Sequence, residues 1–307
     1  MRRLELLIAE ARRQSNNTRY DANSGVPQAT FVQYFQNAQD ELEKAAKSVK
    51  GKYFLGQAPI VTVVSGQEEY AYPYDIFMQG IDTLEWSQDG NTYFALTLAT
   101  VKDRLNNQTG WAYGYIPRNE GYLLTPTLAS GFLRVNYIKK VPQLQLRQGL
   151  ITSRTINGSN QLTALTLNVA DTSFDGVSLN EQNYLCVVNR NGSQLAVNIE
   201  YDSVNTTTGV VTITGAAFAL LTTETVPVGA YITVGKSTAN LPNWPTVVES
   251  YLIKYAIYQA KLGDSSTWTK AIKDDVAAMI TSCIECLATP NDDISVPLVS
   301  NWNYLDV

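Results

Sequence analysis

The sequence contains no histidine among its 307 residues. Histidine is the commonest general base, a common ligand of transition metals and the usual partner of a serine or cysteine nucleophile. Its absence argues against most hydrolytic and metal-dependent chemistry. A pair of carboxylates would still permit glycoside hydrolysis, but acidic residues adjacent in the sequence point in different directions. We therefore expect no enzyme activity, no cofactor and no metal site.

Charged residues and cysteines are also scarce. Asp, Glu, Lys and Arg make up 17% of the chain, below the ~25% typical of soluble domains, and the net charge is −5. An acidic balance argues against a protein that grips the nucleic-acid backbone, which requires a basic face. Three cysteines are too few for a disulfide scaffold. We interpret Cys283 and Cys286 as buried helix-face thiols, with a redox pair as the alternative.

Long apolar runs are missing as well. No stretch approaches the ~20 apolar residues that a membrane-spanning helix needs, so we expect no membrane span. The N-terminal sequence MRRLELLIAEARR has arginines before a short apolar run, as a signal peptide does. Glu5 and Glu10 interrupt that run and no small-residue cleavage site follows, so we interpret it as a helix. We expect the protein to fold in a reducing cytoplasm.

The strongest pattern that is present lies between Phe31 and Val49. Its apolar residues recur at spacings of four and three, which predicts one face of an α-helix. These residues are Phe31, Phe35, Ala38, Leu42, Ala46 and Val49. The polar residues Gln36, Gln39, Asp40, Glu43 and Lys47 are expected largely on the other face. A single amphipathic helix cannot bury its own apolar face, so this helix needs partners.

Matching helical patterns lie at both ends of the chain. Residues 2–16 carry Leu4, Leu7, Ile8 and Ala11 on one face, and two helices follow residue 241. Their apolar faces are predicted to be formed by Val248, Leu252, Tyr255 and Leu262, and by Trp268, Ile272, Val276, Met279, Cys283 and either Cys286 or Leu287. We predict a discontinuous helical bundle formed by residues 1–57 and 241–290. The residues expected to pack it are Phe31, Phe35, Leu42, Leu252, Tyr255, Trp268 and Ile272.

The middle of the chain alternates in the manner of β-strands. Residues 58–147 predict a small β-sheet, including a hairpin that turns at Asp89 and Gly90. Residues 148–240 have few charges, many Thr, Asn and Val residues, and turn signals at hairpin spacing. They predict a further inserted β-sandwich or barrel-like domain. The fold class is therefore α+β, with both β-regions inserted into the helical bundle.

Residues 291–307 form a segment that fits neither the bundle nor a disordered tail. Apolar residues alternate in its first half and cluster in its second, and disordered tails normally lack such residues. They are Ile294, Val296, Leu298, Trp302, Tyr304 and Leu305. We interpret the segment as an extended C-terminal arm that docks on another subunit. The alternative is that it folds back onto its own chain.

The order of these parts resembles the head-to-tail adaptor, or connector, proteins of tailed bacteriophages. The resemblance is carried by a short LIAEAR helix, a polar loop ending in Gly-Val-Pro, and a helix reading FVQYFQNAQDEL. A sheet entered through YPYD and a late helix reading VVESYLIKYAIYQAKLGD continue it. The phrase Phe35-Gln36-Asn37-Ala38-Gln39-Asp40 is its strongest part, whereas residues 150–236 are longer than the usual sheet of that family.

The resemblance implies a structural virion protein at the capsid vertex, with no catalytic role. In that family copies form a ring, dodecameric in the usual case, below the portal protein at the head–tail junction. The ring extends the channel through which double-stranded DNA passes without specific binding. It also offers a docking surface to tail, nozzle or fibre proteins. The C-terminal arm is expected to reach the portal, and the bundle residues are expected to pack the ring.

Two other readings remain open. One alternative is that the chain is a different tail, baseplate or fibre-attachment protein of a phage, in which the inserted β-domain carries out the function. A third reading is a carbohydrate-binding or carbohydrate-active protein that uses its strands rich in tyrosine and tryptophan.

Overall fold

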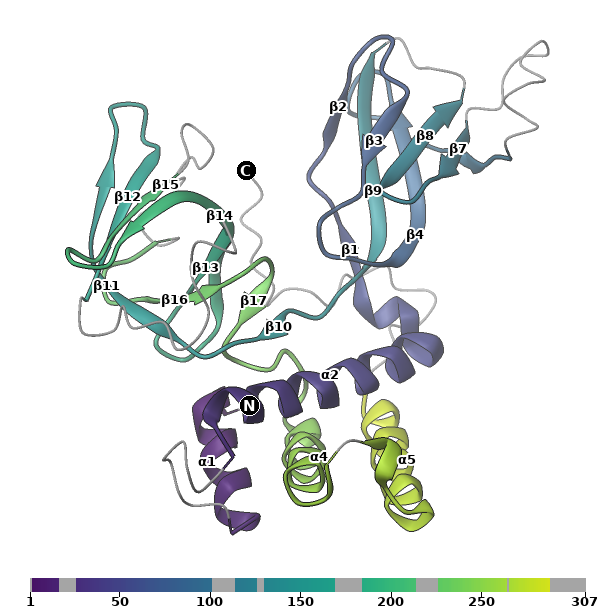
Figure 1. The fold of residues 1–307 in the computed structure, drawn as a ribbon. Coiled ribbons are helices and arrows are strands. Elements are labelled where there is room, and N and C mark those ends of the chain that lie inside the picture. The colour runs from purple at the N-terminus through teal and green to yellow at the C-terminus, as the bar shows by residue number, and fades with distance from the viewer. Residues whose placement is uncertain are drawn as a thin grey trace. The chain divides into compact units, whose positions relative to one another are not determined.

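The computed structural model, shown in Figure 1, contains helices and several β-sheets, which confirms the mixed α and β class. It describes residues 2–16, 26–100, 114–125, 130–168, 184–213, 226–263 and 265–287. The chain divides into two compact units. The first unit comprises Met1–Ala46 and Pro142–Leu287, and the second comprises Lys47–Val141 and Ala288–Val307. The domain boundaries expected from the sequence stay a prediction.

The helices of the first unit are α1 (Leu4–Gln14), α2 (Gln28–Lys50), α4 (Glu249–Leu262) and α5 (Lys270–Glu285). The last turn of α2 is grouped with the second unit. Helix α4 contacts both α1 and α5 and lies between them (Figure 1). Short 3-10 turns precede α4 at Thr246–Val248 and α5 at Ser265–Thr267. Within the described residues, no helix is long and apolar enough to cross a membrane.

Helix α2 is buried on more sides than its apolar pattern predicts. The expected apolar face is fully buried at Phe31, Phe35, Ala38, Leu42 and Ala46, which confirms that part of the prediction. Val49 was wrongly included, because it lies in the last turn and is 67% exposed. The prediction was also wrong for four polar residues placed on the outer face, since all are buried: Gln36, Gln39, Glu43 and Lys47.

The shorter helices follow their patterns except near their ends. Leu4, Leu7, Ile8 and Ala11 of α1 are buried as expected. Helix α4 is buried almost all round, and Leu262 at its end is 46% exposed, which corrects the expected face. The chain stops being helical there because Gly263 adopts a φ of 79°. Cys186 and Cys283 are buried, but Cys286 is exposed, so the expectation of two buried thiols is wrong for Cys286.

The second predicted β-domain is a closed six-stranded barrel. In chain order its strands are β11 (Gln148–Ile156), β12 (Leu162–Leu167), β13 (Tyr184–Val188), β14 (Gln194–Asn205), β15 (Val210–Ile213) and β16 (Tyr231–Val234). Around the barrel the order is β11-β12-β15-β14-β13-β16, with antiparallel neighbours throughout. Buried side chains such as Leu165, Leu185, Val211 and Ile232 fill the interior. The barrel therefore encloses a packed core rather than a channel.

Two short strands join where the chain enters and leaves the barrel. Strand β10 (Gln143–Leu144) pairs in parallel with β17 (Thr238–Ala239). Backbone hydrogen bonds from Gln143 to Ser237 and from Gln145 to Ala239, each 2.9 Å, extend this pairing. The two connections of the barrel thus run side by side.

The second unit contains two small sheets that share an apolar core. Its strands are β1 (Leu55–Gln57), β2 (Val61–Val63), β3 (Glu69–Ala71), β4 (Ile76–Ser87), β5 (Phe94–Ala95), β6 (Thr97–Leu98), β7 (Gly114–Pro117), β8 (Gly121–Thr125) and β9 (Gly131–Lys139). One sheet has the order β1-β9-β4-β5, with β2 also on β9, and the other has the order β3-β8-β7-β6. Leu84, Leu133 and Tyr122 lie at the centre of the core, all fully buried.

The hairpin expected at Asp89 and Gly90 is confirmed by the antiparallel pairing of β4 with β5. The carboxylate of Asp89 accepts hydrogen bonds from the backbone N–H groups of Asn91 and Thr92 and from the hydroxyl of Ser87. These donors stabilise the charged form and lower the pKa of Asp89 to about 2. Gly90 has a φ of 78°, which explains the glycine in this turn.

Candidate interaction surfaces

The residues expected to pack the helices are mostly inside the first unit. Six of them are buried: Phe31, Phe35, Leu42, Leu252, Tyr255 and Trp268. Ile272 is only half-buried. Side chains buried within a chain are held by that chain, so their contribution to contacts between copies stays a prediction. The arm residues Ile294, Val296, Leu298, Trp302, Tyr304 and Leu305 lie outside the described residues.

Within α2, the segment Phe35 to Asp40 contacts the chain at β10, the strand that leads into the barrel. The side-chain amide of Gln36 donates to the carbonyl oxygen of Leu144 over 2.7 Å, and that of Gln39 donates to the carbonyl oxygen of Pro142 over 2.8 Å. All four residues are buried. A buried carbonyl group needs a donor. The two glutamines therefore supply hydrogen bonds to the backbone at β10, a role that apolar periodicity does not detect.

The same segment also contacts α4. The amide of Asn37 donates to the side-chain oxygen of Gln259 over 3.2 Å. The hydroxyl of Tyr251 donates to the carbonyl oxygen of Ala38 over 3.0 Å. Burial, together with the negative charge of Glu41, raises the pKa of Tyr251 well above its usual value. Tyr251 therefore acts as a permanent hydrogen-bond donor between the two helices.

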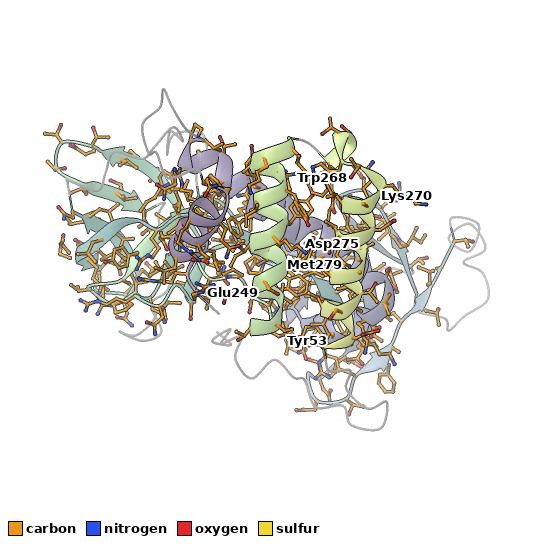
Figure 2. The ribbon with its side chains drawn as sticks, turned by 90° about the horizontal axis from the view of Figure 1, so that it is seen from below. Tyr53, Glu249, Trp268, Lys270, Asp275 and Met279 are labelled. Carbon is orange, nitrogen blue, oxygen red and sulfur yellow. The ribbon has the colours of Figure 1, made fainter. Side chains whose placement is uncertain are left out.

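An aromatic cluster closes the turn between α4 and α5. The ring of Trp268 lies 5.1 Å from that of Tyr255 and 5.8 Å from that of Tyr258, both edge-to-face. Its indole N–H donates to the carbonyl oxygen of Gly263 over 3.1 Å. Figure 2 shows Trp268 between α4 and the start of α5. This geometry fixes the start of α5 against α4.

A polar contact continues that interface along the helix pair. The carboxylate of Asp275 accepts from the hydroxyl of Tyr258 over 2.7 Å and pairs with the ammonium group of Lys254 over 2.8 Å. The hydrogen bond from Lys254 and then that from Tyr258 lower the pKa of Asp275. Both charged side chains are partly exposed, so this pair adds little to stability. The contact joins the middle of α4 to the first half of α5.

The beginning of α1 is joined to the barrel by buried and half-buried polar groups. The amide of Asn240 donates to the carboxylate of Glu5 over 2.9 Å and to the carbonyl oxygen of Gln145 over 3.0 Å. The guanidinium group of Arg147 also donates to Glu5, over 3.1 Å, and stacks on the ring of Tyr231. Arg147 and Arg3 both donate to the carbonyl oxygen of Arg190 in the β13–β14 turn. Sequence patterns did not identify this cluster.

The second unit carries several exposed apolar side chains. Met78 is 75% exposed, Leu98 69% and Phe94 61%. Phe94 and Leu98 lie on β5 and β6, which end the two sheets of this unit in the observed strand order. Each of these strands is only two residues long, and such short edge strands limit the addition of a further strand.

No group of three or more cysteine or acidic side chains in the described part of the chain is arranged to hold a metal ion. The expectations that the protein lacks a cofactor and enzyme activity stay predictions.

Comparison with known proteins found one family. The model of the family described as SU10 adaptor protein matches residues 2–167, which is more than half of the chain. The match spans α1, α2, residues 47–141 of the second unit and the first two strands of the barrel. No curated protein matches the chain.

Proposed function

We propose, on the premise that this chain belongs to the SU10 adaptor protein family of bacteriophage head-to-tail adaptors, that its copies form a ring below the portal protein. The family membership makes the chain a structural component of a phage particle. The ring would extend the DNA channel and offer a docking surface for the tail. The observation that carries the proposal is the family match over residues 2–167, which includes the LIAEAR helix, the FVQYFQNAQDEL helix and the YPYD sequence on which the resemblance partly rests.

The helices are proposed to form a discontinuous bundle that serves as the rigid hub of each subunit. Support comes from the contacts of α4 with α1 and α5 and from the hydrogen bonds that join α2 to α4. A ring subunit must hold its shape while it contacts neighbours on two sides. Hydrogen bonds between buried groups from both ends of the sequence provide such rigidity.

The arm, residues 291–307, is proposed to bind the portal in an extended form. Its alternating apolar residues suit a peptide that adds to a partner, which then buries them. The barrel is proposed to contact tail, nozzle or fibre proteins. An acidic chain without histidine suits a channel through which DNA slides, because a basic surface would retain the phosphate backbone.

The position of the protein in the particle tests this proposal. Antibody labelling of intact particles in electron micrographs is expected to mark the head–tail junction. Particles made without the protein are expected to be DNA-filled heads that lack tails. Labelling at the baseplate or on the fibres would instead support the alternative that the chain is another tail component.

The role of the arm has its own test with purified protein and portal. Deletion of residues 291–307 is expected to abolish portal binding while the melting temperature of the remaining chain stays unchanged. A finer variant replaces Trp302, Tyr304 and Leu305 by alanine, and its matched control replaces Ser295 and Ser300. If the truncated chain unfolds, the arm belongs to the core of its own chain.

A further inference from the structure

The two outer helices of the first unit present complementary outer faces. On α1 the exposed residues Leu6, Ala9 and Arg13 are spaced by three and four, so they share one face. Leu6 is 46% exposed, so it adds apolar surface to this face. Arg2, just before α1, is also exposed. This face therefore combines an exposed apolar side chain with a positive charge at each end.

The outer face of α5 has the opposite charges. Asp274, Ala278, Thr281 and Glu285 are all exposed and are spaced by four, three and four. They lie on the side of α5 opposite Val276 and Cys283, which are buried. The face is thus small at its centre and carries a carboxylate toward each end, with the exposed Lys270 one turn before Asp274. A row of small side chains leaves room for a larger apolar side chain of a partner helix.

The spacings allow the two faces to meet in one register. In an antiparallel pair, Arg13 lies opposite Asp274, Ala9 opposite Ala278, and Leu6 opposite Thr281. The end of α1 that carries Arg2 then lies near Glu285. This direction also brings the C-terminal end of α1, which has a partial negative charge, to the positive N-terminal end of α5.

We propose that the outer face of α1 docks on the outer face of α5 in a second copy of this chain. Pairing like with like is unfavourable: two α1 faces would bring arginines together, and two α5 faces would bring carboxylates together. The contact is therefore heterologous, and because α4 separates α1 from α5, each copy has one face for each neighbour. Heterologous contacts that close give rings, so this inference rests on the proposed function and names its interface.

The ion pairs within each copy are compatible with this contact. Arg13 binds the carboxylate of Glu10 through Nε and Nη2, yet its side chain remains 70% exposed. Arg2 pairs with Glu249 and is 47% exposed. An arginine has five N–H donors, so each guanidinium group can bind a second carboxylate. The pairs also hold the arginines in place, which reduces the entropy lost on association.

Cross-linking tests the register. Leu6→Cys and Thr281→Cys are combined in a chain with Cys286→Ser, and the purified protein is treated with a short bismaleimide over a range of concentrations. A ladder of covalent oligomers is expected, because each copy links to two neighbours. The matched controls carry only one of the two new cysteines and are expected to give no ladder. Absence of a ladder from the double variant overturns the inference.

Charge reversal tests the complementarity. Arg13→Glu or Asp274→Lys alone, added to the cross-linking variant, is expected to slow ladder formation at least about tenfold, since like charges then face each other. The combination is expected to restore the rate to within about threefold, as a re-formed pair does. Lys44→Glu, at an exposed position of α2, is the control. Unchanged rates in both single variants would refute the interface.

Circular dichroism and thermal melting of each variant separate these effects from loss of folding. The same cysteine variants in assembled particles separate the inference from the proposed function. Particles that contain the protein at the head–tail junction but yield no ladder would leave the function standing and remove this interface. Absence of the protein from that junction would remove the proposed function, while the ladder from purified protein still decides the contact.

Discussion

The side-chain amide of Gln39 donates a hydrogen bond of 2.8 Å to the carbonyl oxygen of Pro142, a residue 103 positions later in the chain. The contact joins the central helix to the strand that leads into the barrel, and both residues are buried. Gln36 makes the equivalent contact with Leu144 one turn earlier. Two buried amides thus hold a segment that would otherwise present unpaired carbonyl groups to the interior.

Replacing Gln39 by leucine is expected to lower the free energy of unfolding by about 1–3 kcal/mol, because the carbonyl oxygen of Pro142 loses its donor away from water. Urea denaturation followed by circular dichroism measures this. Gln33→Leu on the exposed side of the same helix is the matched control, with an expected change within about 0.5 kcal/mol. Equal effects of the two variants would show that the buried hydrogen bond adds nothing.

Tyr251→Phe removes the hydroxyl that joins α4 to α2. We expect a loss of about 1 kcal/mol, the usual net value of one buried hydrogen bond. Tyr258→Phe serves as the comparison, since its acceptor Asp275 is 38% exposed and can bind water instead. The smaller effect is therefore expected for Tyr258→Phe. A larger loss in that variant would mean that the α4–α5 contact, rather than the α2–α4 contact, limits stability.

The packed interior of the barrel makes a third prediction. Ile232 is fully buried on β16, so Ile232→Ala should destabilise the protein by about 2–5 kcal/mol through loss of apolar contacts and an unfilled cavity. Val228, four residues earlier, is 61% exposed, and Val228→Ala should change stability by less than about 0.5 kcal/mol. Thermal unfolding of both variants tests this. A tolerated Ile232→Ala would indicate a loosely packed barrel.

Buried tyrosines predict a loss of stability in alkaline solution. Burial raises the pKa of Tyr201 from 10.0 to about 12. It also raises the pKa values of Tyr122, Tyr137 and Tyr251. Above pH ~10 the unfolded chain releases these protons while the folded chain retains them, so stability is intact below that pH and falls as pH rises.

Urea denaturation at a series of pH values from about 9 to about 12 measures this dependence. In Tyr201→Phe the decline should be shallower, because one fewer proton is released on unfolding. Ultraviolet absorbance of tyrosinate in the folded protein provides the second readout. Early ionisation of all tyrosines near their ordinary pKa would contradict the structure.

The sequence was sufficient to predict the helices and most strands because their signal is local. The apolar spacing of α1 and α2 identified residues that are fully buried, and alternation predicted β-structure over residues 58–240, where most strands lie. The errors at Val49 and Leu262 both lie in last helical turns. There the apolar pattern continues beyond the residues that a neighbour covers.

The polar contacts could not be predicted, because a periodicity analysis assigns every polar residue to solvent. Gln36, Gln39, Glu43 and Lys47 are spaced by three, four and four, so they form a second buried row beside the apolar one. The regular spacing of this polar row is visible in the sequence, but it indicates burial only when the helix is known to have neighbours on several sides. Lys47 illustrates how such a residue is accommodated: its ammonium group lies 3.9 Å from the ring centre of Phe77 and donates to the carbonyl oxygen of Lys139.

Closure of the barrel was likewise beyond local reasoning. The strands and turns suggested either a sandwich or a barrel, and the difference depends on the pairing of β11 with β16, whose residues Gln148 and Ile232 are far apart in the sequence. The proposed docking faces of α1 and α5 were not identified from the sequence either. Their exposed charges suggest a contact between copies only once α4 is known to lie between the two helices.

The parallel pairing of β10 with β17 has a practical corollary. Since Gln143 lies beside Thr238, a few linking residues could replace everything between them, and the flanking backbone would not need to change its path. Removal of the barrel by such a link would leave the helices of the first unit in one continuous chain. The same pair of strands, β10 and β17, is a site at which a foreign domain could be inserted in place of the barrel.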